Sequence, residues 1–162
     1  MQNSSVRPTG EIERAVDTYG DALYRLCIVM LKNDSDAQDA VQETFIRYMQ
    51  KAPQFRDPGH EKAWLITVAA NKCRDMLRFK SRHPQVSIDA VAETAEEKSS
   101  SGIMETLMTL PEKYRLVLML HYVEEYPVAD IAKIIGKTPS AVKMRLQKGR
   151  KLLEEAYRKE FL

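Results

Sequence analysis

The sequence predicts an all-α protein with two small helical domains joined by a flexible acidic linker. Apolar residues recur at steps of three and four in two long stretches, and no stretch alternates as a half-buried strand would. The 162 residues include 44% hydrophobic and 30% charged side chains, which is enough to form a folded core. Between the two stretches lies a segment from Pro84 to Gly102 that contains no aromatic residue.

This middle segment separates a domain at residues 1–83 from a domain at residues 103–162, with residues 84–102 as the linker. It carries one Lys against four carboxylates, and its end, from Ser99 to Gly102, has the composition of a flexible tether. An ordered surface loop or a short helix is the alternative. We favour the linker because loops of this length are uncommon inside compact domains.

Three helices are predicted in the first domain. The first ends near Asn33 and carries the apolar stripe Ile12, Val16, Tyr19, Leu23, Leu26 and Met30. Asp34 or Ser35 caps the second, whose buried stripe consists of Ala37, Val41, Phe45 and Tyr48. After breaks at Pro53 and Pro58, the third covers residues 61–80, with the inner face Leu65, Val68, Ala69, Cys73 and Met76.

The second domain opens with residues 103–110. Pro111 then starts a helix that continues through Tyr122, because a proline at the first helical position lacks only an N–H that would have no partner anyway. A short helix is predicted at residues 127–135.

A glycine turn follows this short helix. Gly136 stops it, Thr138 can cap the next helix, and Pro139 suits that helix's first position. The final helix is predicted to continue to about Arg158. Two helices joined by a tight glycine turn form a helix-turn-helix candidate.

The exposed side of the final helix is basic. Residues 133–151 hold seven Lys and Arg residues and no Asp or Glu. At about 100° per residue, one side is apolar and consists of Val142, Leu146, Gly149, Leu153 and Ala156. The opposite side carries Ser140, Lys143, Met144, Gln147, Lys148 and Lys151. Such side chains suit base edges and phosphates, so the pattern predicts a DNA recognition helix; a merely solvated basic helix is the alternative.

A second basic surface is predicted on the third helix. Asp75 is the only acid among Lys72, Arg74, Arg78, Lys80 and Arg82. The stripe away from the core carries Thr67, Asn71, Arg74 and Arg78, with Trp64 at its edge and the loop at residues 54–58 before it. Aromatic and amide groups beside cations suit unpaired bases. Trp64 fits a position in the core equally well.

The outward side of the second helix has a different character. It carries Asp36, Asp39, Glu43 and Gln50 with Ile46 among them, and Gln42 and Arg47 at its flanks. An exposed Ile among carboxylates fits either a contact with a partner protein or an ordinary surface, because single exposed aliphatic residues are common.

Composition and motifs argue against several classes of function. The sequence has no P-loop, nucleophile elbow or H-E-x-x-H motif, so we expect no catalytic residue, metal or cofactor. Two Cys are too few for a disulfide framework. We find neither a signal peptide nor a membrane span, and therefore expect a cytoplasmic protein that is not membrane-inserted. The net charge of +2 does not decide whether nucleic acid is a partner.

With these segments placed, the chain resembles bacterial RNA polymerase sigma factors of the extracytoplasmic-function (ECF) group, in the sigma-70 family. Three stretches and a linker of the expected length carry the resemblance. The stretches are DSDAQDAVQETFIRYMQ at residues 34–50, FRDPGHEKAWLITVAANKCRDMLR at 55–78 and LPEKYRLVLMLHYVEEYPVADIAKIIGKTPSAVKMRLQKGRKLL at 110–153. The resemblance implies a non-catalytic subunit that binds RNA polymerase core, directs it to promoters and helps to open the DNA.

The resemblance also implies roles for single residues. The second helix matches the segment that docks on the clamp coiled coil of the largest polymerase subunit, through Asp39, Gln42, Glu43, Ile46 and Arg47. The loop and third helix match the part that captures a flipped minus-ten base, through Phe55, Arg56, Asp57, Trp64, Asn71, Arg74 and Arg78. The helix-turn-helix matches the minus-thirty-five reader, with Ser140, Lys143, Met144, Gln147 and Lys148 toward bases and Arg115, Lys137, Thr138, Arg145 and Arg150 toward the DNA backbone.

The implied partners are core polymerase, promoter DNA and an anti-sigma factor, with no small-molecule substrate. No cysteine-rich segment or further carboxy-terminal domain is visible, so we expect sensing to reside in another protein. The alternative function is a two-lobe helix-turn-helix regulator that acts independently of polymerase. The second domain is compatible with it, whereas the first domain favours the sigma factor. A pure protein-interaction module would leave the basic helix without a purpose.

Overall fold

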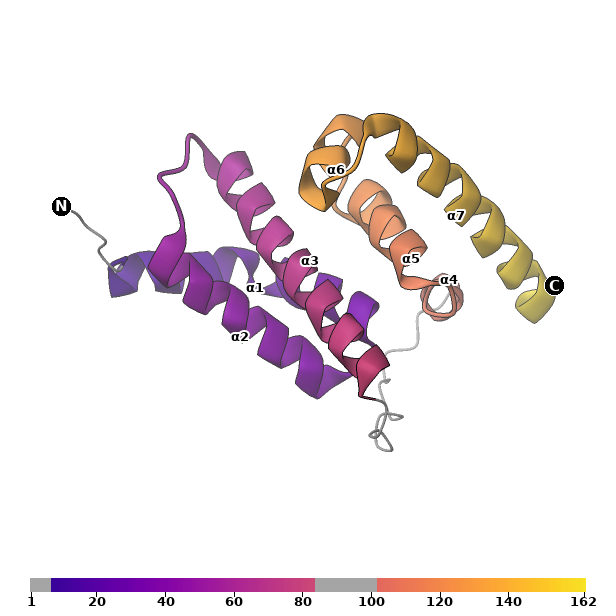
Figure 1. The fold of residues 1–162 in the computed structure, drawn as a ribbon, viewed down its shortest axis with the longest axis horizontal. Helices are drawn as coiled ribbons and strands as arrows, with labels where there is room; N and C mark the ends of the chain where they lie inside the picture. Colours follow the sequence, from indigo (N-terminus) through magenta and orange to yellow (C-terminus); the bar gives the residue numbers. More distant parts are fainter. Residues whose placement is uncertain (1–6, 84–101) are drawn as a thin grey trace. The chain divides into compact units, whose positions relative to one another are not determined.

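The computed structural model describes residues 7–83 and 102–162, and every regular element in these two ranges is helical (Figure 1). The chain divides into two compact units, Met1–Val86 and Ser87–Leu162. The predicted all-α class with two helical domains is therefore confirmed. Of the flexible linker predicted at residues 84–102, all but Gly102 lie outside the described residues, so its character and its boundaries stay a prediction.

The described part of the first unit is a bundle of α1 (Thr9–Leu31), α2 (Asp34–Lys51) and α3 (Pro58–Arg82), and each helix packs against the other two (Figure 1). The largest side chains of its core are less than 2% exposed and include Leu23, Leu26, Met30, Tyr48, Leu65 and Ile66. Burial of an aliphatic or aromatic side chain of this size contributes roughly 1.5–3 kcal/mol, so these residues provide much of the unit's stability.

The buried stripes differ from the predicted ones at a few positions. Val16 was predicted in the core but is 42% exposed. The buried line on α1 passes through Ala15 and Tyr19 instead, and Val16 lies about 100° around the helix from Ala15. Four more predicted core residues lie at the margins of their stripes and are half-buried: Ile12, Val41, Val68 and Met76.

Two helix starts also differ. Asn33 caps α2, rather than Asp34 or Ser35, because its extended backbone lets its side chain accept a 2.8 Å hydrogen bond from the Asp36 N–H. The third helix begins at Pro58, earlier than predicted, because Asp57 caps it by accepting a 2.8 Å bond from the His60 N–H.

The second unit contains α4 (Ile103–Leu107), α5 (Glu112–Leu118), the π-helical turn η2 (Met119–Val123), α6 (Val128–Ile135) and α7 (Pro139–Phe161). The long helix predicted from Pro111 therefore changes its geometry after Leu118. The Glu124 N–H donates to the carbonyl of Met119, five residues earlier, at 3.1 Å. The core of this unit includes Leu116, Val117, Met119, Leu120 and Ile131.

The pair α6 and α7 is the predicted helix-turn-helix. Gly136 ends α6 with φ 70°, in the left-handed region that glycine adopts readily. The Thr138 hydroxyl caps α7 by accepting a 3.1 Å bond from the Ala141 N–H, and Pro139 is the first residue of the helix. No helix in residues 7–83 or 102–162 is long and apolar enough to cross a membrane.

Candidate nucleic-acid interface

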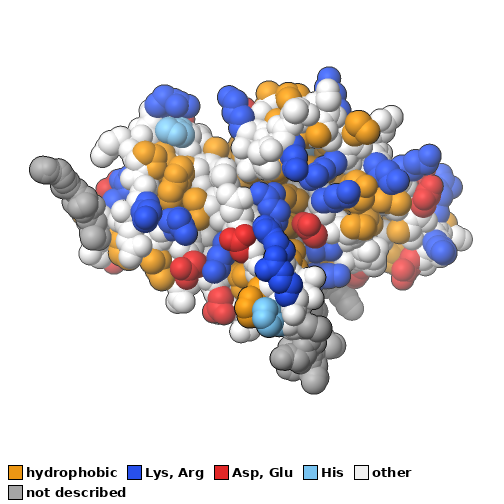
Figure 2. Space-filling model, viewed as in Figure 1, with side chains coloured by type: hydrophobic (Ala, Val, Ile, Leu, Met, Phe, Trp, Pro, Cys, Tyr) orange, Lys and Arg blue, Asp and Glu red, His pale blue; other side chains and the backbone are white. Residues whose placement is uncertain are grey.

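The residues of α7 that were predicted to face bases point to solvent. Ser140, Lys143, Gln147 and Lys148 are exposed, and Met144 is 68% exposed. On the opposite side Val142, Leu146 and Gly149 are buried, as the periodicity predicted. Figure 2 shows Lys and Arg side chains gathered along α7. Residues 139–151 of the helix thus offer a cationic surface with amide and hydroxyl groups in its midst and no carboxylate, which suits contact with polyanionic DNA.

The residues predicted to flank this surface have several environments. Lys137 and Thr138 are exposed at the start of α7, where Thr138 also caps the helix. Arg150 is exposed and donates a 3.1 Å hydrogen bond to the hydroxyl of Tyr122. Arg145 is half-buried.

Arg115 is buried, unlike the exposed positions expected of residues that contact the DNA backbone. The residue is 4% exposed, and its guanidinium donates a 2.6 Å hydrogen bond to the carbonyl of Leu110. Burial lowers the pKa of Arg115, although the nearby carboxylate of Glu112 acts in the opposite direction. This hydrogen bond joins α5 to Leu110, the residue before Pro111.

The loop before α3 packs into an aromatic cluster in the first unit. The ring of Phe55 is half-buried and lies nearly parallel to Tyr48, with centroids 6.2 Å apart. Trp64 meets Phe55 edge-on at 6.0 Å and Tyr48 at 6.3 Å. Because Trp64 is half-buried, it combines the core and surface positions that the sequence left open. Arg56 and Asp57 are exposed beside this cluster.

The basic stripe of α3 lies farther along the same helix. Arg74 donates a 2.5 Å hydrogen bond to the side-chain oxygen of Asn71, and Arg78 pairs with Asp75 at 3.3 Å. Figure 2 shows Lys and Arg side chains along the C-terminal half of α3. Asn71 follows Trp64, the residue of the loop cluster that lies on α3, by seven residues, which corresponds to about 10 Å of helix axis. The predicted minus-ten residues therefore fall into two candidate subsites, the loop cluster and the stripe.

The outward face of α2 carries all five residues predicted to bind core polymerase. Ile46 is 37% exposed, and Asp39, Gln42, Glu43 and Arg47 around it are exposed as well. Asp36 on the same helix pairs with Lys80 of α3 at 2.6 Å. In the described part of the chain, neither Asp39, Glu43 nor Arg47 has such an ion pair, so their charges stay available to a partner.

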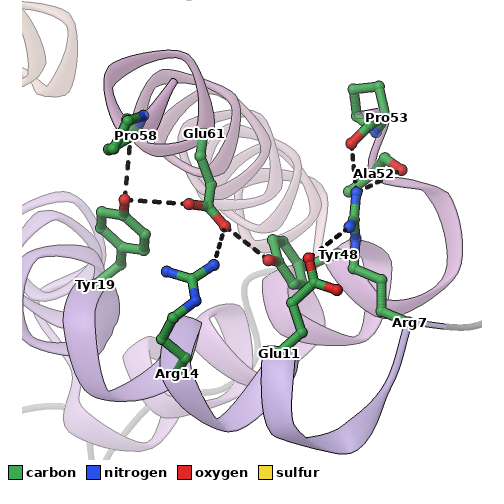
Figure 3. A network of polar contacts seen from close by, with 9 residues as sticks. All are labelled: Arg7, Glu11, Arg14, Tyr19, Tyr48, Ala52, Pro53, Pro58 and Glu61. Carbon is green, nitrogen blue, oxygen red and sulfur yellow. Dashed lines mark hydrogen bonds and ion pairs between the residues drawn. The ribbon is translucent and has the colours of Figure 1, made fainter. Parts of the chain in front are cut away.

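A buried carboxylate that the sequence analysis did not single out lies at the start of α3. Glu61 is 6% exposed and accepts hydrogen bonds from Tyr48 at 2.7 Å, Arg14 at 2.9 Å and Tyr19 at 3.2 Å (Figure 3). Burial disfavours its charge, but these bonds and the charge of Arg14 outweigh burial and hold the pKa of Glu61 below its ordinary value. Burial, and to a smaller extent the hydrogen bond to Glu61, raises the pKa of Tyr48 to about 12. Glu61 lies four residues before Leu65, a predicted core residue of α3, and this helical spacing is the sequence signal for its inward position.

An apolar groove of about 560 Å³ crosses the second unit between α4, η2 and α7. Its lining includes Met104, Leu107, Tyr122, Leu153 and Tyr157. Among the residues that the structure describes, no group of three or more His, Cys, Asp or Glu side chains is placed to hold a metal ion. The candidate surfaces are therefore two DNA-facing regions, the face of α2 and this groove.

Comparison with known families identifies both units. Residues 15–83 match Sigma-70 region 2, and residues 101–153 match Sigma-70, region 4. The ECF RNA polymerase sigma factor SigW of Bacillus subtilis is 30% identical over 162 residues, covering 88% of this chain and 87% of SigW. The RNA polymerase sigma factor SigV of the same organism is 29% identical over 144 residues, covering 86% of each chain.

Solved structures share the fold. The sigma factor RpoE of Bartonella quintana, solved in complex with the anti-sigma factor NepR, matches with a TM-score of 0.77 at 23% identity, covering 91% of this chain and 97% of that chain. CnrH in complex with the cytosolic domain of CnrY matches with a TM-score of 0.66 at 24% identity, covering 91% and 88%. The match to both sigma-70 regions in order, and the identity to SigW over most of both chains, show that this chain belongs to the ECF RNA polymerase sigma factors, which direct the polymerase to promoters.

Proposed function

We propose that three surfaces of this chain divide the work of a non-catalytic initiation subunit in the cytoplasm. The outward face of α2 docks on the clamp coiled coil of the largest polymerase subunit. The loop cluster and the stripe of α3 take the minus-ten element, and the exposed side of α7 reads the minus-thirty-five element. Arg115, which is buried, has no part in this proposal.

The observation that carries the proposal is the face of α2. A basic recognition helix would serve equally well in a regulator that binds DNA without polymerase, but such a regulator has no use for Ile46 exposed among unpaired charges on another unit. An exposed aliphatic side chain surrounded by charges is typical of a protein–protein contact. Burial of the apolar centre provides affinity, and the charges provide specificity.

We also propose an anti-sigma factor as a partner. Of the two structural relatives, RpoE was solved with a bound anti-sigma factor and CnrH with the cytosolic domain of CnrY. The groove of the second unit supports the proposal, because Met104 and Tyr122 on its rim are 36% and 54% exposed. An apolar surface of this kind suits the apolar side of an amphipathic helix.

The α2 surface can be tested with Ile46→Asp and a matched control, Val16→Asp. Both positions are aliphatic, both lie on helices of the first unit, and their exposed fractions are similar, at 37% and 42%. The aspartate at position 46 must be desolvated within the interface without a partner, which weakens core binding by about 2 kcal/mol or more, or at least roughly 30-fold in Kd.

The measurement is a titration of each folded variant against core polymerase. Ile46→Asp should bind much more weakly than the parent chain, whereas Val16→Asp should bind like it. Equal affinities for the parent chain and Ile46→Asp would refute the docking surface.

A further inference from the structure

Arg7 lies just before α1 and extends its side chain to the loop between α2 and α3 (Figure 3). One terminal nitrogen of its guanidinium donates to the carbonyls of Ala52, at 3.1 Å, and of Pro53. The other donates to the carboxylate of Glu11 at 3.0 Å. The side chain is only 11% exposed, so these contacts are largely shielded from water.

The same guanidinium covers the aromatic rings that shape the loop. Its central carbon lies 4.9 Å from the ring centroid of Tyr48 and 5.4 Å from that of Phe55. A cation over an aromatic face is attracted by the ring's negative face, more strongly where water is excluded. Tyr48 is fixed from its other end, because its hydroxyl donates to Glu61 (Figure 3). Arg7 therefore holds both the loop backbone and the ring of Phe55 against a rigid support.

We propose that Arg7 is a positioning residue for minus-ten recognition: it orders the loop at residues 52–57, and with it Phe55, before the flipped base arrives. This inference rests on the proposed role of the loop. Ordering a loop in advance lowers the entropy lost on binding, and so strengthens binding of the base that fits. Only a planar guanidinium provides several directed donors together with a flat cationic face for the rings.

Arg14 provides a contrast within the same network. It is also an arginine of the amino-terminal segment and also pairs with a carboxylate, Glu61, at 2.9 Å. Its contacts stay on α3, and among the described residues it has no hydrogen bond to residues 52–57. Loss of Arg14, whose side chain is 51% exposed, should thus lower stability only slightly and leave the loop ordered, whereas loss of Arg7 should loosen the loop.

The experiment measures base preference and not total activity. Polymerase core with Arg7→Ala, Arg7→Lys, Arg14→Ala or the parent chain is given templates whose minus-ten segment is held open by mismatches, with each of the four bases in turn at every non-template position. Abortive transcripts are counted. The ratio between the best and the worst base at a position does not depend on the fraction of active protein, so a merely unstable variant leaves it unchanged.

For the parent chain we expect a clear preference at the captured position. Arg7→Ala should reduce that ratio by about 5- to 10-fold, which is the effect of losing one ordinary hydrogen bond. Arg7→Lys should recover part of it, and Arg14→Ala should keep it. An unchanged ratio in Arg7→Ala would overturn the inference, as would an equal loss in Arg14→Ala. If the parent chain itself shows no preference at any position, the proposed role of the loop fails first.

Discussion

Replacing Glu61 by Gln tests whether the charge of this buried carboxylate, and not only its shape, stabilises the first unit. Oε2 accepts from Arg14 at 2.9 Å and from Tyr48 at 2.7 Å, and Oε1 accepts from Tyr19 at 3.2 Å. A Gln carbonyl can take the place of Oε2. Its NH₂ group can face Tyr19, whose hydroxyl then donates its single proton to the Pro58 carbonyl, 3.3 Å away.

The expected magnitude follows from these bonds. With Gln all partners remain satisfied, so the loss is the difference between charged and neutral hydrogen bonds, about 1–2 kcal/mol in the free energy of unfolding. In Glu61→Ala the hydroxyl of Tyr48, a residue with 0% exposure, has lost its acceptor. The decrease in the free energy of unfolding should then rise to about 3 kcal/mol or more. Arg14 adds little to either value, because its side chain is 51% exposed and its ion pair is screened by solvent.

Urea unfolding followed by the fluorescence of Trp64, the single tryptophan of the chain, reports on this unit. The pKa of Glu61 is lower in the folded than in the unfolded state, so its charge stabilises the fold above the unfolded pKa and this stability is lost as pH falls through the folded pKa. The gap between the parent chain and Glu61→Gln should therefore be full at pH 7 and shrink in the acid range below about pH 4. A gap that does not change with pH, or a Gln variant as unstable as Ala, would refute the role assigned to the charge.

Two further predictions concern the second unit. Lys143→Ala or Gln147→Ala should change the ranking of minus-thirty-five promoter sequences, by about 1–3 kcal/mol at the matching base pair, whereas Arg150→Ala should lower the use of all of them alike and reduce the salt dependence of binding by about one ion. A transcription assay on a promoter library distinguishes these outcomes. An unchanged ranking with Lys143→Ala and Gln147→Ala would contradict base reading by α7. Arg115→Ala should lower the stability of the second unit by about 2–3 kcal/mol, because the carbonyl of Leu110 loses its hydrogen-bond donor. The salt dependence of promoter binding, measured on the folded fraction, should stay that of the parent chain. A smaller salt dependence in Arg115→Ala would indicate that Arg115 does contact a phosphate.

Local signals explain what the sequence predicted well. The cap of Thr138 and the left-handed turn at Gly136 depend only on neighbouring residues, and both are found where the pattern placed them. The two-sided character of α7 follows in the same way from its period. The cap of α2 was less certain because Asn33, Asp34 and Ser35 are all capable of capping, and the choice depends on how the chain leaves α1.

Contacts that follow no helical period explain what the sequence did not predict. Arg115 is buried because a carbonyl five residues earlier is turned toward it, and a basic residue in a basic region gives no sign of this. Arg7 reaches carbonyls 45 and 46 residues away, and no periodicity connects such positions. Val16 shows the same limit in the core: the side of α1 that packs against the other helices includes Ala15, which is 0% exposed, and leaves Val16 42% exposed.

In the proposed minus-ten role, α3 would set the spacing at which a single strand is held. The loop cluster and the stripe that begins at Asn71 belong to one uninterrupted helix, so the distance between them is fixed by the fold. Trp64 in the loop cluster and Asn71 in the stripe are seven residues apart, which is about 10 Å along the helix axis. In the proposed minus-ten role the two subsites would meet different parts of the strand. Inserting or deleting one residue between them would change both their spacing and, by about 100°, the side from which the stripe meets the strand.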